Sequence, residues 1–352
     1  MQALSTHALR PRRFLSRHLH GRAGFRTLGV IAVLVAVQAA MVFAFVFPGN
    51  NPKPHHVPMG FVGPAQAEQS LAAKYGDKLT VHSYQTEQAA RTAINERRIY
   101  GAVIATDSGN RLLVASAASM TVSQMLRGAA ESAGKPVQVQ DVAPLDRNDP
   151  RGATINLMFL PLIVVCFTAM LALGSLHLPP RRMIAATVLF SLLAGVGITA
   201  VTSAGLDALP GSFLALSGMS ALTVLAIALP TAGLHRLFGK AGLALSAVVF
   251  LVIGNSASGN GAAPELLPGF WRWISQLMPP GAGGTGIRNV SYFDGHALTQ
   301  PLLVLATYAA LGAALVVAAD ALRRRRTRNA GEAPAVNAKP RELRERTALR
   351  VA

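Results

Sequence analysis

The chain has 352 residues, of which 51% are hydrophobic and 14% are charged, and its formal net charge is +17. A strongly basic chain often binds nucleic acid, but here the charge gathers in two terminal segments. Residues 1–26 hold six arginines and no acid, and residues 322–352 hold ten Lys and Arg against three Glu. Because both segments flank apolar stretches, we expect them to set membrane orientation and attract membrane lipids, which excludes nucleic acid as the partner.

Six long apolar stretches contain no Lys, Arg, Asp or Glu. Each is close to the ~20 residues that a helix needs to cross a hydrocarbon core of ~30 Å. The sequence therefore predicts an α-helical polytopic membrane protein with six transmembrane helices. The stretches are Thr27–Phe47, Thr154–Leu176, Met183–Gly205, Phe213–Leu234, Ala241–Gly259 and Pro301–Ala319.

The short basic turns between these stretches all fall on one side of such a topology. They are His177–Arg182, His235–Lys240 and the run Arg323–Arg326. Positive charge in short loops marks the cytoplasmic side. We therefore expect a multi-pass protein of the cytoplasmic membrane with both termini cytoplasmic: a basic tail or interfacial helix at 1–26, a first span at 27–47, a five-helix membrane domain at 154–321 and a basic tail at 322–352.

Residues 48–153 then form a small α/β extracellular domain, inserted between the first and second spans. Strand and helix patterns alternate along it. Thr86 is the expected N-cap of the second helix, and Asp107–Asn110 the turn of a hairpin. The expected strands are Val57–Val62, Leu79–Ser83, Tyr100–Thr106, Arg111–Ala115 and Val137–Val142, and the expected helices are Gln66–Tyr75, Glu87–Arg97 and Met120–Ser132.

No motif in the chain indicates an enzyme or a cofactor site. The nearest approach to a nucleotide-binding loop, Gly233–Ala241, has one residue too many between its glycines and no Ser or Thr after its lysine. His55 and His56 have no further ligands at metal spacing. Cys166 is the one cysteine, which excludes an intrachain disulfide and a thiolate metal cluster.

The segment before the sixth stretch has an unusual composition. Both tryptophans of the chain, Trp271 and Trp273, lie within Pro264–Gly281, and Gly286–Gly295 follows. Proline and glycine bound two expected short helices, near 268–278 and 281–291. Such backbone is tolerated at membrane depth only where protein or a watery cavity shields it, so we expect outer re-entrant helices at about 264–292.

The stretch Leu267–Gly295 resembles the extracellular segment before the last span of bacterial ABC type-2 exporter permeases. The resemblance is to the phage-infection-protein-like branch, whose members have one span, a large extracellular domain and five further spans. The stretches Tyr100–Ile104 and Leu113–Ser119 also resemble the extracellular domain of that branch.

The resemblance implies the permease subunit of an exporter, which forms a homo- or heterodimer and pairs with a separate cytoplasmic ATPase subunit. It also implies an outer cap over the translocation path, made here of Trp271, Trp273, Pro279, Arg288 and Tyr292. The ATPase would dock before the first span and on the turn between spans two and three. Those positions hold Phe14, Leu15, Leu19, Arg181 and Arg182.

One departure from the family leaves other functions open. The turn His177–Arg182 has six residues and two prolines, too few for a full coupling helix. A non-transporting envelope receptor or scaffold, acting through the extracellular domain, is therefore an alternative. An ion-coupled carrier is a second alternative, although the stretches lack the ionisable residues that such carriers use.

Several residues carry structural expectations. Arg288 meets anionic head groups or pairs with Asp294, or else it extends to the membrane interface as an ordinary surface arginine. Gly195, Gly197 and Gly205 allow close helix packing. Residues 14–19 form an interfacial amphipathic helix, or belong to a disordered basic tail.

Overall fold

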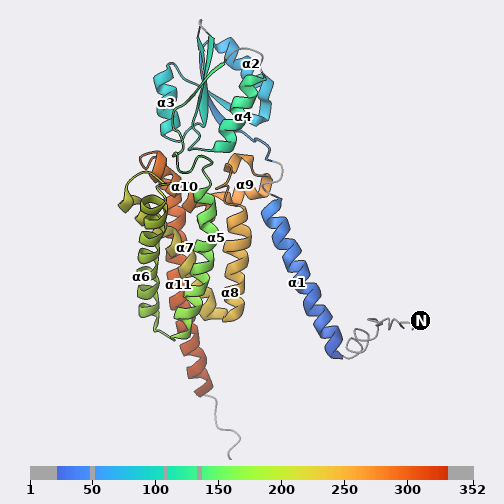
Figure 1. Cartoon of the computed structure of the whole chain (residues 1–352). Coiled ribbons are helices and arrows are strands. Elements are labelled where there is room, and N and C mark those ends of the chain that lie inside the picture. Colours follow the sequence, from blue (N-terminus) through green and yellow to red (C-terminus); the bar gives the residue numbers. More distant parts are fainter. Residues whose placement is uncertain (1–21, 48–51, 107–108, 133–136, 332–352) are drawn as a thin grey trace, which may run out of the picture. The chain divides into compact units, whose positions relative to one another are not determined.

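A computed structural model of the whole chain describes residues 22–47, 52–106, 109–132 and 137–331 (Figure 1). The chain divides into two compact units, Met1–Pro52 and Lys53–Ala352. The described part of the first unit is helix α1, Arg22–Val46. Its apolar side chains are exposed almost all round, with 6% of its most apolar window buried. A helix that is apolar all round is normally buried, either in a protein core or in a membrane.

Five helices in the described residues are long and apolar enough to cross a membrane, which indicates a multi-pass membrane protein. Five of the six predicted stretches therefore form helices of spanning length. Besides α1 they lie in α5 (Thr154–Ser175), α6 (Pro180–Thr199) with the π-helix η3 (Ala200–Gly205), α7 (Phe213–Phe238) and α11 (Thr299–Gly331).

The remaining predicted stretch, Ala241–Gly259, forms a shorter helix. It consists of α8 (Lys240–Ser246) and the π-helix η4 (Ala247–Asn255), together sixteen residues. At ~1.5 Å per residue such a helix covers about 24 Å, less than the ~30 Å of a hydrocarbon core. After Asn255 the chain leaves the helix and folds into shorter elements, so the count of six spans is not confirmed.

The predicted extracellular segment forms a five-stranded sheet in the order β2-β1-β3-β4-β5. In Figure 1, α3 covers one face of the sheet, and α2 and α4 cover the other. The predicted elements are confirmed to within two residues at each end. The strands are Val57–Val62, Leu79–Ser83, Gly101–Thr106, Gly109–Val114 and Val137–Asp141, and the helices are Ala65–Tyr75, Glu87–Asn95 and Met120–Glu131, with a 3-10 turn η2 at Gly76–Lys78.

Local sequence signals explain this accuracy. The hydroxyl of Thr86 accepts the backbone N–H of Ala89, as predicted for the N-cap of α3. Strands β3 and β4 pair antiparallel with Thr106 opposite Gly109, which confirms the predicted hairpin. The other pairings, β1 with β2, β1 with β3 and β4 with β5, are parallel.

The core of this α/β domain extends into the segment before α11. Ala263, Leu266 and Phe293 are buried in the same cluster as Ile94 and Leu113 of the domain. Burial of apolar area is the main stabilising term in folding. The α/β domain therefore completes its core with residues that follow it by more than a hundred positions in the chain.

Helix α7 lies at the centre of the membrane domain. It supplies residues to both helical cores, and 67% of its most apolar window is buried, against 28% or less in the other four. Gly195 of α6 packs directly on α7, where an added Cβ would lie 2.5 Å from the carbonyl oxygen of Ser217. This position confirms close packing at glycine. Gly197 faces open space, and Gly205 meets only Ala200 of its own helix turn, so the prediction is wrong for these two.

The basic turns meet at one end of the membrane domain. Arg236, at the end of α7, donates to the backbone carbonyl of Leu178 between α5 and α6 at 2.9 Å. Its guanidinium also lies 3.7 Å from the carboxylate of Asp320 on α11. Asp320 in turn pairs with Arg324 at 2.8 Å. The turns that the sequence places on one side of the membrane are therefore neighbours in space.

Substitutions at two glycines of α6 test the packing of this helix on α7. Gly195→Ala should destabilise the protein by about 1–3 kcal/mol, because the new methyl group overlaps the α7 backbone. Gly197→Ala, two residues away, should be neutral or stabilising by up to ~1 kcal/mol, since alanine is the better helix former. The midpoint temperature of heat-induced aggregation in detergent measures both. Equal midpoints for the two variants would contradict the packing.

Candidate functional site

The site is built around a short helix sunk between the long ones. Helix α10, Pro279–Tyr292, follows η5 (Pro264–Leu266) and α9 (Gly269–Ser275), which confirms the predicted pair of short helices. Proline starts α10 at a position where the missing N–H costs nothing. Eleven of its fourteen residues are buried. Small residues permit this: a Cβ at Gly283 would overlap the side chain of Thr223 on α7.

Arg288 is the charged residue that α10 carries into the protein. Its side chain is only 8% exposed, and its guanidinium donates to the backbone carbonyl of Asn260 at 2.9 Å. No described ion pair includes Arg288. A buried guanidinium with few partners is costly, so its surroundings must supply polar contacts.

A second guanidinium approaches from the α/β domain. Arg97 follows α3 in a left-handed conformation with φ of 64°, which is uncommon outside glycine and asparagine. It donates to the side-chain oxygen of Asn289 on α10 at 3.1 Å. It also lies 4.8 Å from the ring centroid of Phe293 and 5.5 Å from that of Tyr100. Cation–π contact of this kind holds the guanidinium in place without a carboxylate.

The carboxylate of Glu265 lies near these two guanidiniums. Tyr100, the residue before β3, donates its hydroxyl to the half-buried Glu265 at 2.7 Å. Burial, and then the nearby negative charge of Glu265, raise the pKa of Tyr100 above its ordinary value. The bond joins the α/β domain to the segment that leads into α9. We call Arg97, Tyr100, Glu265, Arg288 and Asn289 the junction cluster.

The junction cluster lines a cavity of about 240 Å³. Polar side chains of Gln276, Thr285 and Gln300 also face it. Arg288 borders a second, smaller space of about 20 Å³, together with Asp149 and Tyr292, which is room for about one water molecule. The larger cavity offers hydrogen-bond donors from two guanidiniums and can hold water or a small anion.

Asp149 and Tyr292 are themselves engaged. The Asp149 carboxylate accepts the backbone N–H groups of Ala153 and Thr154 at 2.8 and 3.0 Å, at the start of α5. The Tyr292 hydroxyl donates to the carbonyl of Ala208 at 3.2 Å. Within the described residues no cluster of three His, Cys, Asp or Glu could hold a metal ion.

The structure brings together only part of the predicted outer cap. Arg288 and Tyr292 border one small space, and Pro279 is buried at the start of α10. Trp271 and Trp273 lie on α9, where Trp273 is 69% exposed. Arg288 neither pairs with Asp294 nor extends to the surface, so these two expectations are wrong, because α10 turns its side chain into the protein. Contact with lipid head groups stays a prediction.

The predicted ATPase-docking residues divide into two groups. Phe14, Leu15 and Leu19 lie outside the described residues. Arg181 and Arg182 are exposed in the first turn of α6. Because α5 ends at Ser175 and α6 begins at Pro180, no helix forms between them, as the length of the turn predicted.

Arg97, Glu265 and Asn289 were not among the residues predicted for the site. Glu265 did carry a signal, because it is the only acidic residue between Asp207 and Asp294. An isolated acid in such a segment is expected to have a partner. Arg97 carried no such signal in the sequence, because Glu96-Arg97-Arg98 is typical of an exposed helix end. Only the fold brings Arg97 to Asn289.

Comparison with known proteins does not assign the chain to a family. No family model matches it. No curated protein matches it in sequence.

The bond between Tyr100 and Glu265 should contribute to stability. Tyr100→Phe leaves the carboxylate without its donor and should destabilise the protein by about 1–3 kcal/mol. Glu265→Gln keeps an acceptor for the Tyr100 hydroxyl, so it should destabilise the protein less than Tyr100→Phe does. The aggregation midpoint in detergent compares the two, and a Tyr100→Phe protein at least as stable as Glu265→Gln would contradict the assignment.

Tyr100 should also make stability depend on alkaline pH. Because folding raises its pKa, its contribution is fully present below the unfolded pKa of ~10 and is lost as pH rises above it. The midpoint of the wild-type protein should therefore fall relative to that of Tyr100→Phe between about pH 9 and about pH 11. Melting curves across this range measure the difference, and a constant difference would argue against a buried phenol.

Proposed function

We propose that the chain is the membrane-spanning permease subunit of an ABC-type exporter, which moves an unidentified substrate while a separate subunit hydrolyses ATP. It works in the cytoplasmic membrane as a homo- or heterodimer, with both termini cytoplasmic and the α/β domain outside. The observation that carries the proposal is α10: a short glycine- and proline-rich helix, buried among spanning helices, with a guanidinium inside.

A buried short helix suits the outer end of a translocation path. Helix ends and turns at membrane depth require shielding by protein or a watery cavity, and a cavity of about 240 Å³ lies next to α10. Ionisable residues held at such a depth are usually functional. In this proposal α9 and α10 cap the path on the outer side, and the junction cluster links the cap to the α/β domain.

The opposite end of the membrane domain suits a cytoplasmic partner. Arg181 and Arg182 are exposed at the N-terminus of α6, where the helix dipole disfavours positive charge. No described acid pairs with either. An acidic surface on the ATPase would supply the missing counter-charge.

A receptor or scaffold acting through the α/β domain is the second candidate. The absence of a helix between α5 and α6 favours it, since that position lacks the usual coupling element. Two variants distinguish the candidates. A receptor loses function when residues 55–150 are removed, and it keeps function when Arg181 and Arg182 are replaced. A permease loses function when the two arginines that contact the ATPase are replaced.

Charge reversal at the start of α6 tests the permease proposal. The chain, purified with its partners from its native membrane, should carry a nucleotide-binding subunit. Arg181→Glu with Arg182→Glu should reduce the recovered ATPase at least about tenfold, because two favourable charge contacts become repulsive. Lys240→Glu, an exposed charge at the next turn, is the matched control and should retain it. Absence of any nucleotide-binding subunit from the wild-type preparation would overturn the proposal.

A further inference from the structure

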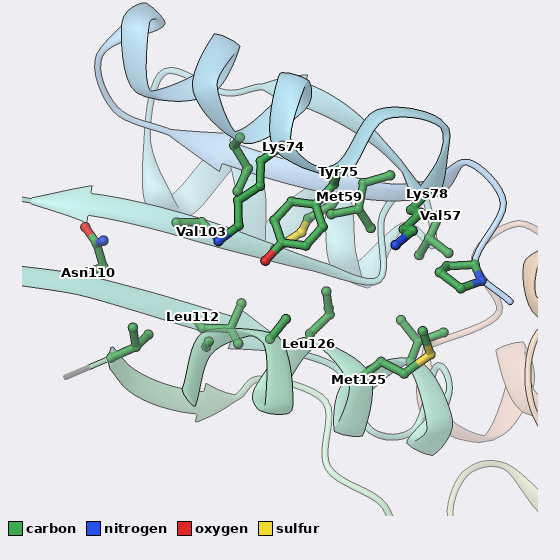
Figure 2. A pocket seen from close by; sticks show the side chains of 17 residues that line it. Val57, Met59, Lys74, Tyr75, Lys78, Val103, Asn110, Leu112, Met125 and Leu126 are labelled. Atoms are coloured by element: carbon green, nitrogen blue, oxygen red, sulfur yellow. The ribbon is translucent and has the colours of Figure 1, made fainter. Parts of the chain in front are cut away.

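One face of the sheet in the α/β domain is not fully covered. A cavity of about 400 Å³ lies between α2 and α4, over β1, β3 and β4. Its volume is within the ~300–1,000 Å³ range of small-molecule sites. Figure 2 shows Lys74 and Tyr75 on one side of this space, and Leu112, Met125 and Leu126 on the other. We call it the sheet cavity.

The strand pattern makes the floor of the sheet cavity apolar. Val57 and Met59 are alternate residues of β1, so both face the same side of the sheet. Val103 and Leu112 are paired across β3 and β4 and face that side too. The opposite face is filled by α3, whose Ile94 is fully buried.

The two helices over the floor pack unequally. Helix α4 buries Val122 and Leu126. Helix α2 buries no residue at all, and its inward residues Leu71 and Tyr75 are only half-buried. Protein interiors are normally packed without such voids. An apolar ligand would cover the exposed inner side of α2.

Charge marks one edge of the sheet cavity. Lys74 and Lys78 belong to its lining, and no Asp or Glu does. The Lys74 ammonium lies 5.4 Å from the ring centroid of Tyr75, and no described ion pair involves either lysine. An apolar space with two cations at its edge is complementary to an amphiphile with an anionic head.

We propose that the sheet cavity binds a single-chain anionic amphiphile of the fatty-acid type. The alkyl chain lies on Met59, Val103 and Leu112 between α2 and α4, and the carboxylate lies against Lys74 and Lys78. One alkyl chain fits the volume, whereas a two-chain lipid does not. The proposal does not depend on the permease function, because the site lies wholly within the α/β domain.

Photolabelling of the full chain in nanodiscs tests the site. The probe is dodecanoate carrying a diazirine on its chain, and the labelled residues are mapped by mass spectrometry. Label is expected on α2 and α4, around Leu71 and Met125. Label confined to the membrane-spanning helices would show partition into lipid only and would overturn the proposal.

Two neighbouring residues of α4 give matched variants. Ala129 lines the sheet cavity, whereas a side chain at Gly128 would enter open space. Ala129→Phe should abolish labelling in the α/β domain, and Gly128→Phe should leave it unchanged. Equal labelling in the two variants would overturn the site. A dimer of the wild type that Ala129→Phe dissociates would identify a second copy as the occupant instead, and would also overturn it.

The lysines test the chemical class of the ligand. Lys74→Glu with Lys78→Glu should weaken competition by unlabelled dodecanoate at least about fivefold, the effect expected of two charge contacts at an exposed edge. Competition by dodecanol should not change. If the alcohol and the carboxylate compete equally in the wild type, the anionic part of the assignment is wrong.

Discussion

The burial of α10 is the constraint on which the rest of the structure depends. A helix made largely of glycine and small residues can approach its neighbours until backbones touch, and α10 does so with eleven of fourteen residues buried. It thereby takes a guanidinium out of water, which is costly unless polar groups surround it. The junction cluster, the cavity beside it and the carbonyl of Asn260 are the consequences.

The same helix ties the two halves of the second unit together. Phe293, which follows α10, is buried in the core of the α/β domain, and Asn289 on α10 receives Arg97 from that domain. The α10 end of the membrane domain is therefore in direct contact with the α/β domain. The junction cluster adds polar contacts between the two halves. At the opposite end, Arg236 joins α7 to the turn between α5 and α6 through Leu178, and to α11 through Asp320.

The sequence predicted elements whose signals are local. The five strands and three helices of the α/β domain follow from period-two and helical patterns, and the Thr86 cap from a single hydroxyl. Predictions that needed contacts between distant residues were less successful. Gly195 and Gly197 look alike in sequence, yet only Gly195 faces α7. The pairing of Arg288 with Asp294 failed because six positions along a buried helix end do not bring the two side chains together.

By itself, the sequence determined a polytopic membrane protein, the α/β domain and the clustering of basic turns, because hydrophobicity, periodicity and charge act along the chain. Only the tertiary structure decided which residues of α10 are buried, that Arg97 and Glu265 join the same cluster, and that a cavity remains between α2 and α4. All three features depend on packing between segments that are far apart in the chain. A helix that packs one residue out of register contacts a different set of neighbours.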